Sequence, residues 1–247
     1  MAKAPKTAYV CNDCGAEFSR WQGQCSACKA WNTISEVRLI SVSNSTKNDR
    51  FSGYAGETRA KIQTLSEISL QETPRFTSGF KELDRVLGGG IVPGSAILIG
   101  GHPGAGKSTL LLQVMCGLAK NMTALYVTGE ESLQQVAMRA NRLNLPTDKL
   151  NMLSETSVEQ ICNLADQLKP QIIVVDSIQV MHLSDIQSSP GSVAQVRECA
   201  SFLTRYAKTR QVAIIMVGHV TKDGTLAGPK VLEHAIDCSL LLEGEAD

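Results

Sequence analysis

The stretch that most constrains the fold is "GHPGAGKSTLLLQ", residues 101–113, which follows the apolar run "SAILIG" and leads into more apolar sequence. Its spacing matches the pattern G-x-x-x-x-G-K-[ST], and it lies between a strand-like run and a helix-like run, as that pattern requires. Glycines in such a turn let backbone N–H groups converge on one point beside the positive end of the following helix dipole. The sequence therefore predicts a phosphate-binding loop, or P-loop.

A P-loop predicts ATP and Mg²⁺ as ligands. The Lys107 ammonium is expected to reach the β- and γ-phosphates, and the Ser108 hydroxyl to complete the magnesium shell, with Thr109 as a weaker contact. The predicted nucleotide-binding residues run through the whole turn: Gly101, His102, Pro103, Gly104, Ala105, Gly106, Lys107, Ser108 and Thr109.

Four continuous apolar runs, "AILIG", "ALYVTG", "QIIVVD" and "VAIIMVG", alternate with helical patterns over 107–119, 132–143, 157–168 and 192–208. Strands that are apolar along their whole length are typical of a parallel sheet covered on both faces. The predicted fold is therefore α/β, with a mainly parallel sheet.

Polar residues at the ends of these runs supply the candidate catalytic groups, which together are Lys107, Glu130, Glu131, Asp176 and His219. Asp176 is predicted to be the second magnesium ligand, with a turn-capping role as the alternative. One of Glu130 and Glu131, preferably Glu130, is predicted to orient or deprotonate the attacking water; both are otherwise first-turn acids of the next helix. His219 is a candidate γ-phosphate sensor or a structural side chain.

Two loops, "HLSDIQSSPGS" and "TKDGTLAGPK", follow the strands that bear Asp176 and His219. They are predicted to be surface loops at the edge of the sheet where open α/β folds bind ligands. Lys222 and Lys230 are candidate DNA-binding residues, with solvated lysines as the alternative. The formal net charge is zero, so overall charge neither favours nor excludes a polyanionic partner.

Half of the eight cysteines form two C-x-x-C pairs separated by ten residues: Cys11, Cys14, Cys25 and Cys28. This spacing predicts a four-thiolate Zn²⁺ site, which is structural because no coordination position stays open. Disulfides are the alternative, disfavoured in a cytoplasmic chain. Trp21 and Trp31 flank the second pair and are expected to pack over it, with stacking on bases or on a partner as the alternative. The other cysteines are expected to be inert core residues.

These features divide the chain into a zinc-binding module at 1–35, a polar linker at 36–75 and an ATPase domain at 76–247. No apolar run approaches the roughly 18 residues that span a bilayer, and the N-terminus has no signal-peptide h-region, so we expect a cytoplasmic protein with no membrane partner.

The segments "CNDC", "RWQGQCSACKAWNT", "RFTSGFKELDRVLGGGIVPGSAILIGGHPGAGKSTLLLQ", "SSPGSVAQVRE" and "GHVTKDGTLAGPKVLEH" together resemble the bacterial RadA (Sms) family, over essentially the whole chain. The resemblance implies a RecA-like ATPase core that forms homo-hexameric rings and binds single-stranded and branched DNA. It also implies a DnaB-type helicase that promotes branch migration with RecA in recombination and repair. The family continues into a "KNRFG" motif and a Lon-protease-like domain, so we expect this sequence to be a truncated piece.

The residues alone predict an ATP-hydrolysing domain of the RecA type, and the resemblance extends this to a DNA-dependent motor. Two rival interpretations are a P-loop kinase acting on a small molecule and a nucleotide-gated interaction module. A kinase needs an arginine-rich lid, and the sequence has no such run.

Overall fold

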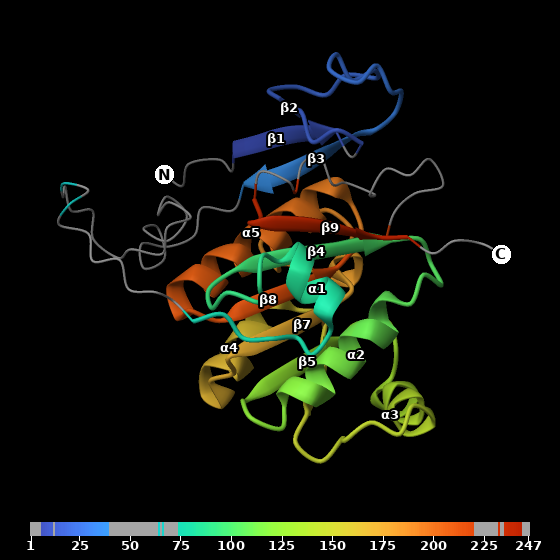
Figure 1. The fold of residues 1–247 in the computed structure, drawn as a ribbon. Helices are drawn as coiled ribbons and strands as arrows, with labels where there is room; N and C mark the ends of the chain where they lie inside the picture. Colours follow the sequence, from blue (N-terminus) through green and yellow to red (C-terminus); the bar gives the residue numbers. More distant parts are fainter. Residues whose placement is uncertain are drawn as a thin grey trace.

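The computed structural model describes residues 6–11, 13–39, 74–219 and 235–243, together with residues 64, 66 and 232. Within them, a six-stranded sheet lies between helices, and a separate three-stranded sheet is formed by the first strands of the chain (Figure 1). The larger sheet has the order β6-β5-β7-β8-β4-β9, and all its neighbouring strands are parallel. Its strands are β4 (Ala96–Gly101), β5 (Ala124–Thr128), β6 (Asn151–Ser154), β7 (Ile172–Asp176), β8 (Ala213–Val217) and β9 (Cys238–Leu242).

The four central strands, β4, β5, β7 and β8, are buried along their whole length. They coincide with the four apolar runs, which confirms the predicted parallel α/β sheet. The edge strands differ: β6 is only partly buried, and burial alternates along β9. The predicted strands did not include β6, because its sequence "NMLS" carries neither a long apolar run nor an alternating pattern.

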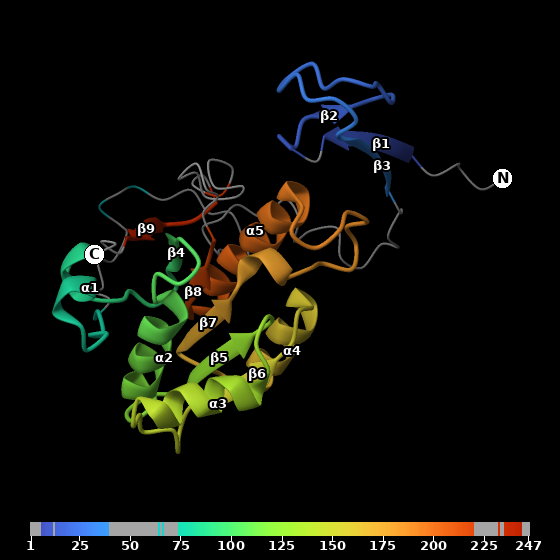
Figure 2. The ribbon, with the colours of Figure 1, turned by 90° about the vertical axis from the view of Figure 1, so that its right-hand side faces the viewer.

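Helices cover both faces of the sheet (Figure 2). One apolar cluster packs the strands against α4 (Val158–Leu168) and α5 (Val193–Arg210). The other packs the opposite face against α2 (Lys107–Leu118) and α3 (Leu133–Arg142), near the short α1 (Lys81–Val86). A 3₁₀ turn, η2 (Ile178–Val180), follows β7.

Helices α2 to α5 match the predicted ranges apart from their terminal residues. Three of them begin after a serine whose hydroxyl accepts a hydrogen bond from a backbone N–H of the first turn: Ser132, Ser157 and Ser192. At α3 the cap is reciprocal, because the Gln135 side chain also accepts a hydrogen bond from the Ser132 backbone N–H.

The small antiparallel sheet has the order β2-β1-β3. It is built from β1 (Lys6–Cys11), β2 (Glu17–Phe18) and β3 (Ile34–Leu39). Strand β3 runs past residue 35, the predicted end of the zinc module, and most of the predicted linker lies outside the described residues. The domain boundaries therefore stay predictions. In the described part of the chain, no helix combines the length and the apolar character needed to cross a membrane.

The parallel arrangement brings four strand ends together. The P-loop follows β4, and the segments after β5, β7 and β8 begin at the same edge of the sheet. The edge that carries the P-loop thus also carries residues that are far apart in the sequence. They are residues 129–131, Asp176 with Ser177, and His219.

Candidate nucleotide and metal sites

The P-loop lies open to solvent, while its lysine is enclosed. His102, Pro103, Gly104 and Gly106 are exposed, whereas only 4% of Lys107 is accessible. Gly106, which precedes α2, has a φ of 89°, a left-handed conformation that glycine adopts without a Cβ clash. An open turn of this kind at a helix N-terminus fits the phosphates of a nucleotide.

The Lys107 ammonium is bonded to its own loop and lies within electrostatic range of two carboxylates. Its Nζ donates hydrogen bonds to the carbonyl oxygens of Gly101, at 2.7 Å, and His102, at 2.9 Å. Burial lowers the pKa of Lys107, and the negative charges of Asp176 and Glu130 offset part of that effect. The lysine and both carboxylates therefore share one electrostatic environment at this edge of the sheet.

Asp176 ends β7 with 9% of its surface exposed. Its Oδ2 accepts a hydrogen bond of 2.6 Å from the hydroxyl of Tyr126, a fully buried residue of β5. Tyr126 was not among the predicted site residues. The available signal was a hydroxyl-bearing side chain within an otherwise aliphatic buried strand, since a buried Tyr O–H needs a partner.

The two adjacent glutamates point to different places. Glu130 Oε1 accepts a hydrogen bond from the Ser177 hydroxyl and lies 3.2 Å from His219 Nε2. Glu131 instead forms an ion pair with Arg139 of α3. Of the two glutamates, only Glu130 thus lies where the ends of β5, β7 and β8 meet, beside Ser177.

Ser177 is fully buried and was also missed from the sequence, because its partner Glu130 is remote along the chain. His219 has 32% of its side chain exposed, and its Nδ1 is buried without a hydrogen-bond partner among the described residues. With Nε2 protonated, His219 donates to Glu130.

The remaining predicted residues are less constrained. Ser108 and Thr109 are half-buried in the first turn of α2, on the P-loop side. Lys222 and Lys230 lie outside the described residues. The individual roles of the predicted site residues stay predictions.

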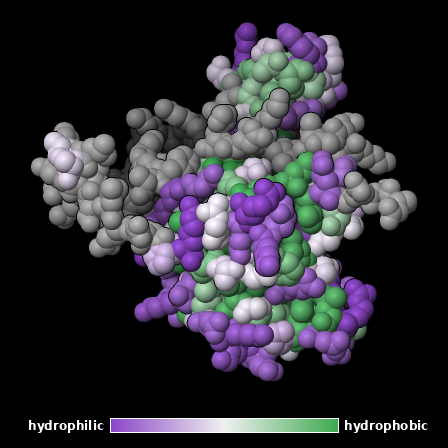
Figure 3. Space-filling model, in the orientation of Figure 1, coloured by the Kyte–Doolittle hydropathy of each residue, from purple (hydrophilic) through white to green (hydrophobic). Residues whose placement is uncertain are grey.

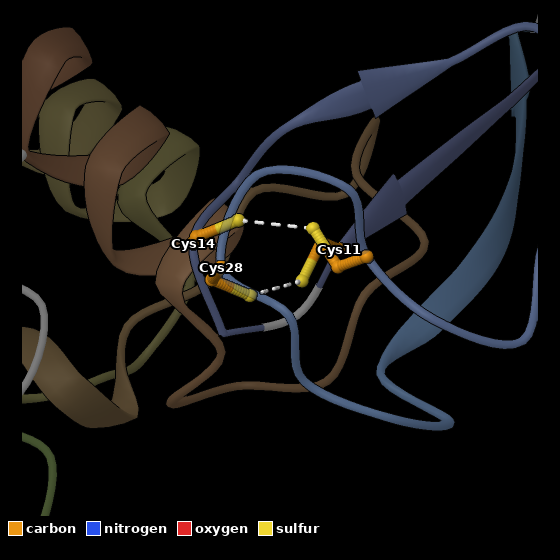
Figure 4. A group of neighbouring side chains, drawn as sticks. Cys11, Cys14 and Cys28 are labelled. Carbon is orange, nitrogen blue, oxygen red and sulfur yellow. Dashed lines mark hydrogen bonds between the residues drawn. The ribbon is translucent and has the colours of Figure 1, made fainter.

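The four cysteines of the two C-x-x-C pairs converge at one place, as their predicted metal role requires. All four Sγ atoms lie within 4.8 Å of one another. Figure 4 shows the sulfurs of Cys11, Cys14 and Cys28 directed toward one another. The Sγ–Sγ distances are 3.7 Å for Cys11 with Cys28 and 3.5 Å for Cys14 with Cys25. Tetrahedral Zn–S bonds of about 2.3 Å place sulfurs roughly 3.8 Å apart, so the cluster fits zinc.

The thiols of this cluster differ in their surroundings. Burial raises the pKa of Cys11, but hydrogen bonds from the Thr33 hydroxyl and from backbone N–H groups outweigh it and lower that pKa to about 6. Burial raises the pKa of Cys14 to about 12. A bound cation would stabilise the thiolate form of all four sulfurs.

The cysteines outside the cluster match the expectation of inert core residues. Cys116, Cys162 and Cys199 are buried, and Cys238 is partly buried. Burial raises the pKa of both Cys162 and Cys199 to about 12. A thiol with so high a pKa carries almost no thiolate at neutral pH, so it is a poor nucleophile.

The expectation that Trp21 and Trp31 pack over the second cysteine pair is wrong. Their exposed fractions are 58% and 68%, so neither ring is buried against the cysteine pair. Both ring edges lie beside Gly23, where an added Cβ would be 3.8 Å from each. The two rings are therefore presented to solvent on the hairpin that carries Cys25 and Cys28.

A shallow polar hollow of about 360 Å³ lies at the opposite edge of the sheet from the P-loop. Its lining includes Lys120, Lys149, Asn151 and Gln171, and none of the predicted site residues. This hollow therefore lies away from the nucleotide site predicted from the P-loop.

Two family profiles match the chain. The AAA domain profile matches residues 61–225, and the rubredoxin metal binding domain profile matches residues 9–36. The second match contains both C-x-x-C pairs, which supports Zn²⁺ as the metal. An ATPase domain of the first kind implies ATP, typically with Mg²⁺.

Curated relatives align along essentially the whole chain. Proteins named DNA repair protein RadA are 94% identical in Haemophilus influenzae and 73% identical in Escherichia coli, each over 100% of this chain and 54% of the relative. The Bacillus subtilis protein of the same name is 46% identical over 99% of this chain and 53% of its own length. The chain thus spans about half the length of these relatives.

Among solved structures, a KaiC-like protein of Pyrococcus horikoshii superposes with a TM-score of 0.57 at 18% sequence identity. The match covers 68% of this chain and 80% of that protein. It confirms the RecA-like fold predicted from the P-loop and the apolar runs. By fold, profile and sequence identity, the chain belongs to the AAA domain family of ATPases and, within it, to the bacterial RadA proteins.

Proposed function

We propose that this chain carries the ATP-binding and ATP-hydrolysing part of a DNA-dependent motor. In the intact protein, a cytoplasmic homo-hexamer would move single-stranded and branched DNA as a DnaB-type helicase, promoting branch migration together with RecA. The observation that carries the enzymatic proposal is Glu130: the ends of β5, β7 and β8 hold it beside Ser177 and His219, within electrostatic reach of Lys107.

The loop and its lysine bind the nucleotide. Backbone N–H groups of the P-loop, which Pro103 lacks, and the α2 dipole attract the phosphates. Lys107 exchanges its bonds to the carbonyls of Gly101 and His102 for bonds to phosphate oxygens. Ser108 and Asp176 would hold Mg²⁺, which neutralises charge that develops on the transferred phosphoryl group.

Glu130 activates water. Its Oε1 is already engaged by Ser177 and His219, which fixes the carboxylate plane and leaves Oε2 as the oxygen for a water molecule. Oε2 orients that water and accepts its proton as the water oxygen attacks the γ-phosphorus and the bond from phosphorus to the bridging oxygen of the departing ADP breaks. Glu131 lacks this placement because Arg139 holds it against α3.

His219 links the site to the segment that contains Lys222 and Lys230. Its Nε2 contacts Glu130, so movement of the carboxylate on nucleotide binding or hydrolysis changes the position of His219. The chain continues from His219 directly into residues 220–230. We propose that this connection passes the nucleotide state to DNA-binding loops. The names of the relatives, DNA repair protein RadA, support DNA as the partner.

The test is phosphate release by the intact protein, measured with and without single-stranded DNA. The motor predicts release that rises with DNA and is lost in Glu130→Gln but retained in Glu131→Gln. Appearance of the phosphate on a metabolite would replace the proposal with a kinase. Nucleotide-dependent partner binding that survives both substitutions, without DNA-stimulated release, would replace it with an interaction module.

A further inference from the structure

Tyr126 places a phenol hydroxyl inside an apolar layer. The residue is fully buried in β5 and belongs to the apolar cluster that packs the sheet against α2 and α3. A buried hydroxyl without a partner costs free energy, so its hydrogen bond shows which group the side chain serves. That bond runs to Oδ2 of Asp176, at 2.6 Å.

The strand register brings the two side chains together. In the parallel pair β5–β7, Tyr126 lies opposite Val174, and Thr128 lies opposite Asp176. Residues two apart on a strand point to the same face, so Tyr126 and Asp176 share a face one side-chain step apart. The long phenol ring spans that step and reaches the carboxylate from the buried side.

The hydrogen bond has a fixed direction. The Tyr126 O–H is the donor and Oδ2 of Asp176 is the acceptor, because a carboxylate has no hydrogen to donate. A neutral phenol donating to a carboxylate is a charge-assisted bond, which is stronger and shorter than a neutral one. Asp176 is thus held through Oδ2, and Oδ1 is the oxygen free of this bond.

We propose that Tyr126 is a positioning residue for the metal-binding Asp176: it anchors Oδ2 so that Oδ1 is presented to Mg²⁺. This inference rests on the proposed function, because it assumes that Asp176 is a magnesium ligand of an ATP site. Groups that orient a metal ligand from behind commonly change metal affinity by about tenfold to hundredfold when removed.

The experiment compares Tyr126→Phe with a matched control, Tyr206→Phe. Tyr206 also donates to an aspartate, Oδ1 of Asp166 at 2.9 Å, but this pair joins α5 to α4 away from the site. Each substitution removes one oxygen from one Tyr–Asp pair. Binding of a fluorescent ATP analogue to the chain is titrated with Mg²⁺, and repeated in EDTA.

For Tyr126→Phe we expect the half-saturating Mg²⁺ concentration to rise by about tenfold to hundredfold, with nucleotide affinity in EDTA unchanged. Tyr206→Phe should change neither. The inference would be overturned if Tyr126→Phe and Tyr206→Phe had the same half-saturating Mg²⁺ concentration. It would also be overturned if Tyr126→Phe lost the same nucleotide affinity in Mg²⁺ and in EDTA. A wild-type chain that binds no nucleotide would instead refute the proposed function.

Two further measurements separate positioning from a general effect on folding. In an Asp176→Asn background, Tyr126→Phe should produce no further change in Mg²⁺ dependence, and an additive change would contradict the pairing. In the wild-type chain labelled with 3-fluorotyrosine, only four tyrosines give ¹⁹F signals. The Tyr126 signal should shift when Mg²⁺ joins the bound nucleotide, while that of Tyr206 stays; no shift at Tyr126 would count against the proposal.

Discussion

Glu130 and Glu131 are adjacent in the sequence but have different surroundings. Glu130 is the candidate catalytic group, and Glu131 forms a structural ion pair. Glu130 faces Ser177 and His219, whereas Glu131 pairs with Arg139. The sequence "TGEES" places both just after a strand, where either one reaches the site in a suitable geometry. Contacts between distant segments distinguish the two: Ser177 and His219 hold Glu130, and Arg139 of α3 holds Glu131.

Glu130→Gln should reduce the rate of phosphate release by the intact protein by about 10²- to 10⁴-fold, because the amide cannot accept the proton of water. ATP affinity should be retained. Glu131→Gln is the matched control and should leave the rate close to wild type. Single-turnover assays at saturating ATP make the comparison, and equal losses in the two variants would contradict the assignment of Glu130.

Among individual residues, the sequence predicted those that belong to a motif of characteristic spacing. The P-loop lysine and the four cysteines belong to short motifs, so their neighbours along the chain suffice to identify them. Tyr126 and Ser177 were missed because their contacts are made across β5 and β7, between residues 50 and 47 positions apart. Strand order and register, which create those contacts, are not visible in one sequence.

Among the elements, β4 and β9 pair closely just before the P-loop, where Gly101 lies opposite Leu242. A Cβ added at Gly101 would lie 2.5 Å from the Leu242 carbonyl oxygen, whereas one at Gly117 in α2 would meet nothing within 4 Å. Backbone atoms cannot move aside as a flexible side chain does. The absence of a side chain at Gly101 therefore allows the start of the P-loop to lie this close to β9.

Gly101→Ala should lower the free energy of unfolding by about 1–3 kcal/mol, because β9 or the loop must shift. It should also weaken ATP binding, since the loop carries the backbone donors. Gly117→Ala should be neutral or stabilise by about 0.5–1 kcal/mol through helix propensity. Thermal unfolding and ATP titration of both variants make the test, and similar values for the two would refute the close approach.

The start of α4 is joined to the segment after η2 through Glu159. Its Oε1 accepts hydrogen bonds of 2.8 Å from both the backbone N–H and the hydroxyl of Ser184, and its Oε2 accepts one of 3.0 Å from Ser157. Burial raises the pKa of Glu159, but these donors outweigh it and lower the pKa below its ordinary value. The folded state therefore favours the charged carboxylate more than the unfolded state does.

A lowered folded pKa contributes stability that is present above the unfolded pKa of about 4.3 and is lost as pH falls through the folded value. Glu159→Gln should thus lower the free energy of unfolding by about 1–2 kcal/mol at pH 7. The difference from wild type should disappear in acid. Glu82→Gln, in an exposed pair with Arg85, should change stability far less. Urea unfolding at a series of pH values from 7 downward checks this; a difference that does not shrink as the pH falls below about 4.3 would contradict it.

The central strands were predictable because long apolar runs are local signals, and so are the helical patterns between those runs. Strand β6 and the order β6-β5-β7-β8-β4-β9 were not, since a half-buried edge strand has a weak pattern and strand order depends on packing across the sheet.

For the whole molecule, the zinc module and the ATPase core are held by different forces. The core has one extended apolar cluster on each face of the sheet. In the described part of the cysteine module, the buried apolar cluster consists of Cys11, Cys25 and Ile34. So small an apolar cluster cannot offset the conformational entropy of the module. Its fold is expected to depend on metal binding.

Removal of zinc by a chelator should therefore unfold the module while leaving ATP binding intact. Limited proteolysis should then cut within residues 6–39, with the fragment from residue 74 onward surviving. Cys28→Ser should reproduce the effect without a chelator and lower the metal content from one zinc per chain. Equal protease resistance of the N-terminal module with and without metal would refute this prediction.

The most direct test of the central claim is a crystal structure of the Glu130→Gln chain with ATP and Mg²⁺. In the proposed site, the phosphates lie over the backbone N–H groups of the P-loop, Lys107 contacts the γ-phosphate, and Ser108 and Asp176 share one Mg²⁺. Nucleotide bound elsewhere, or a metal that Asp176 does not contact, would contradict it.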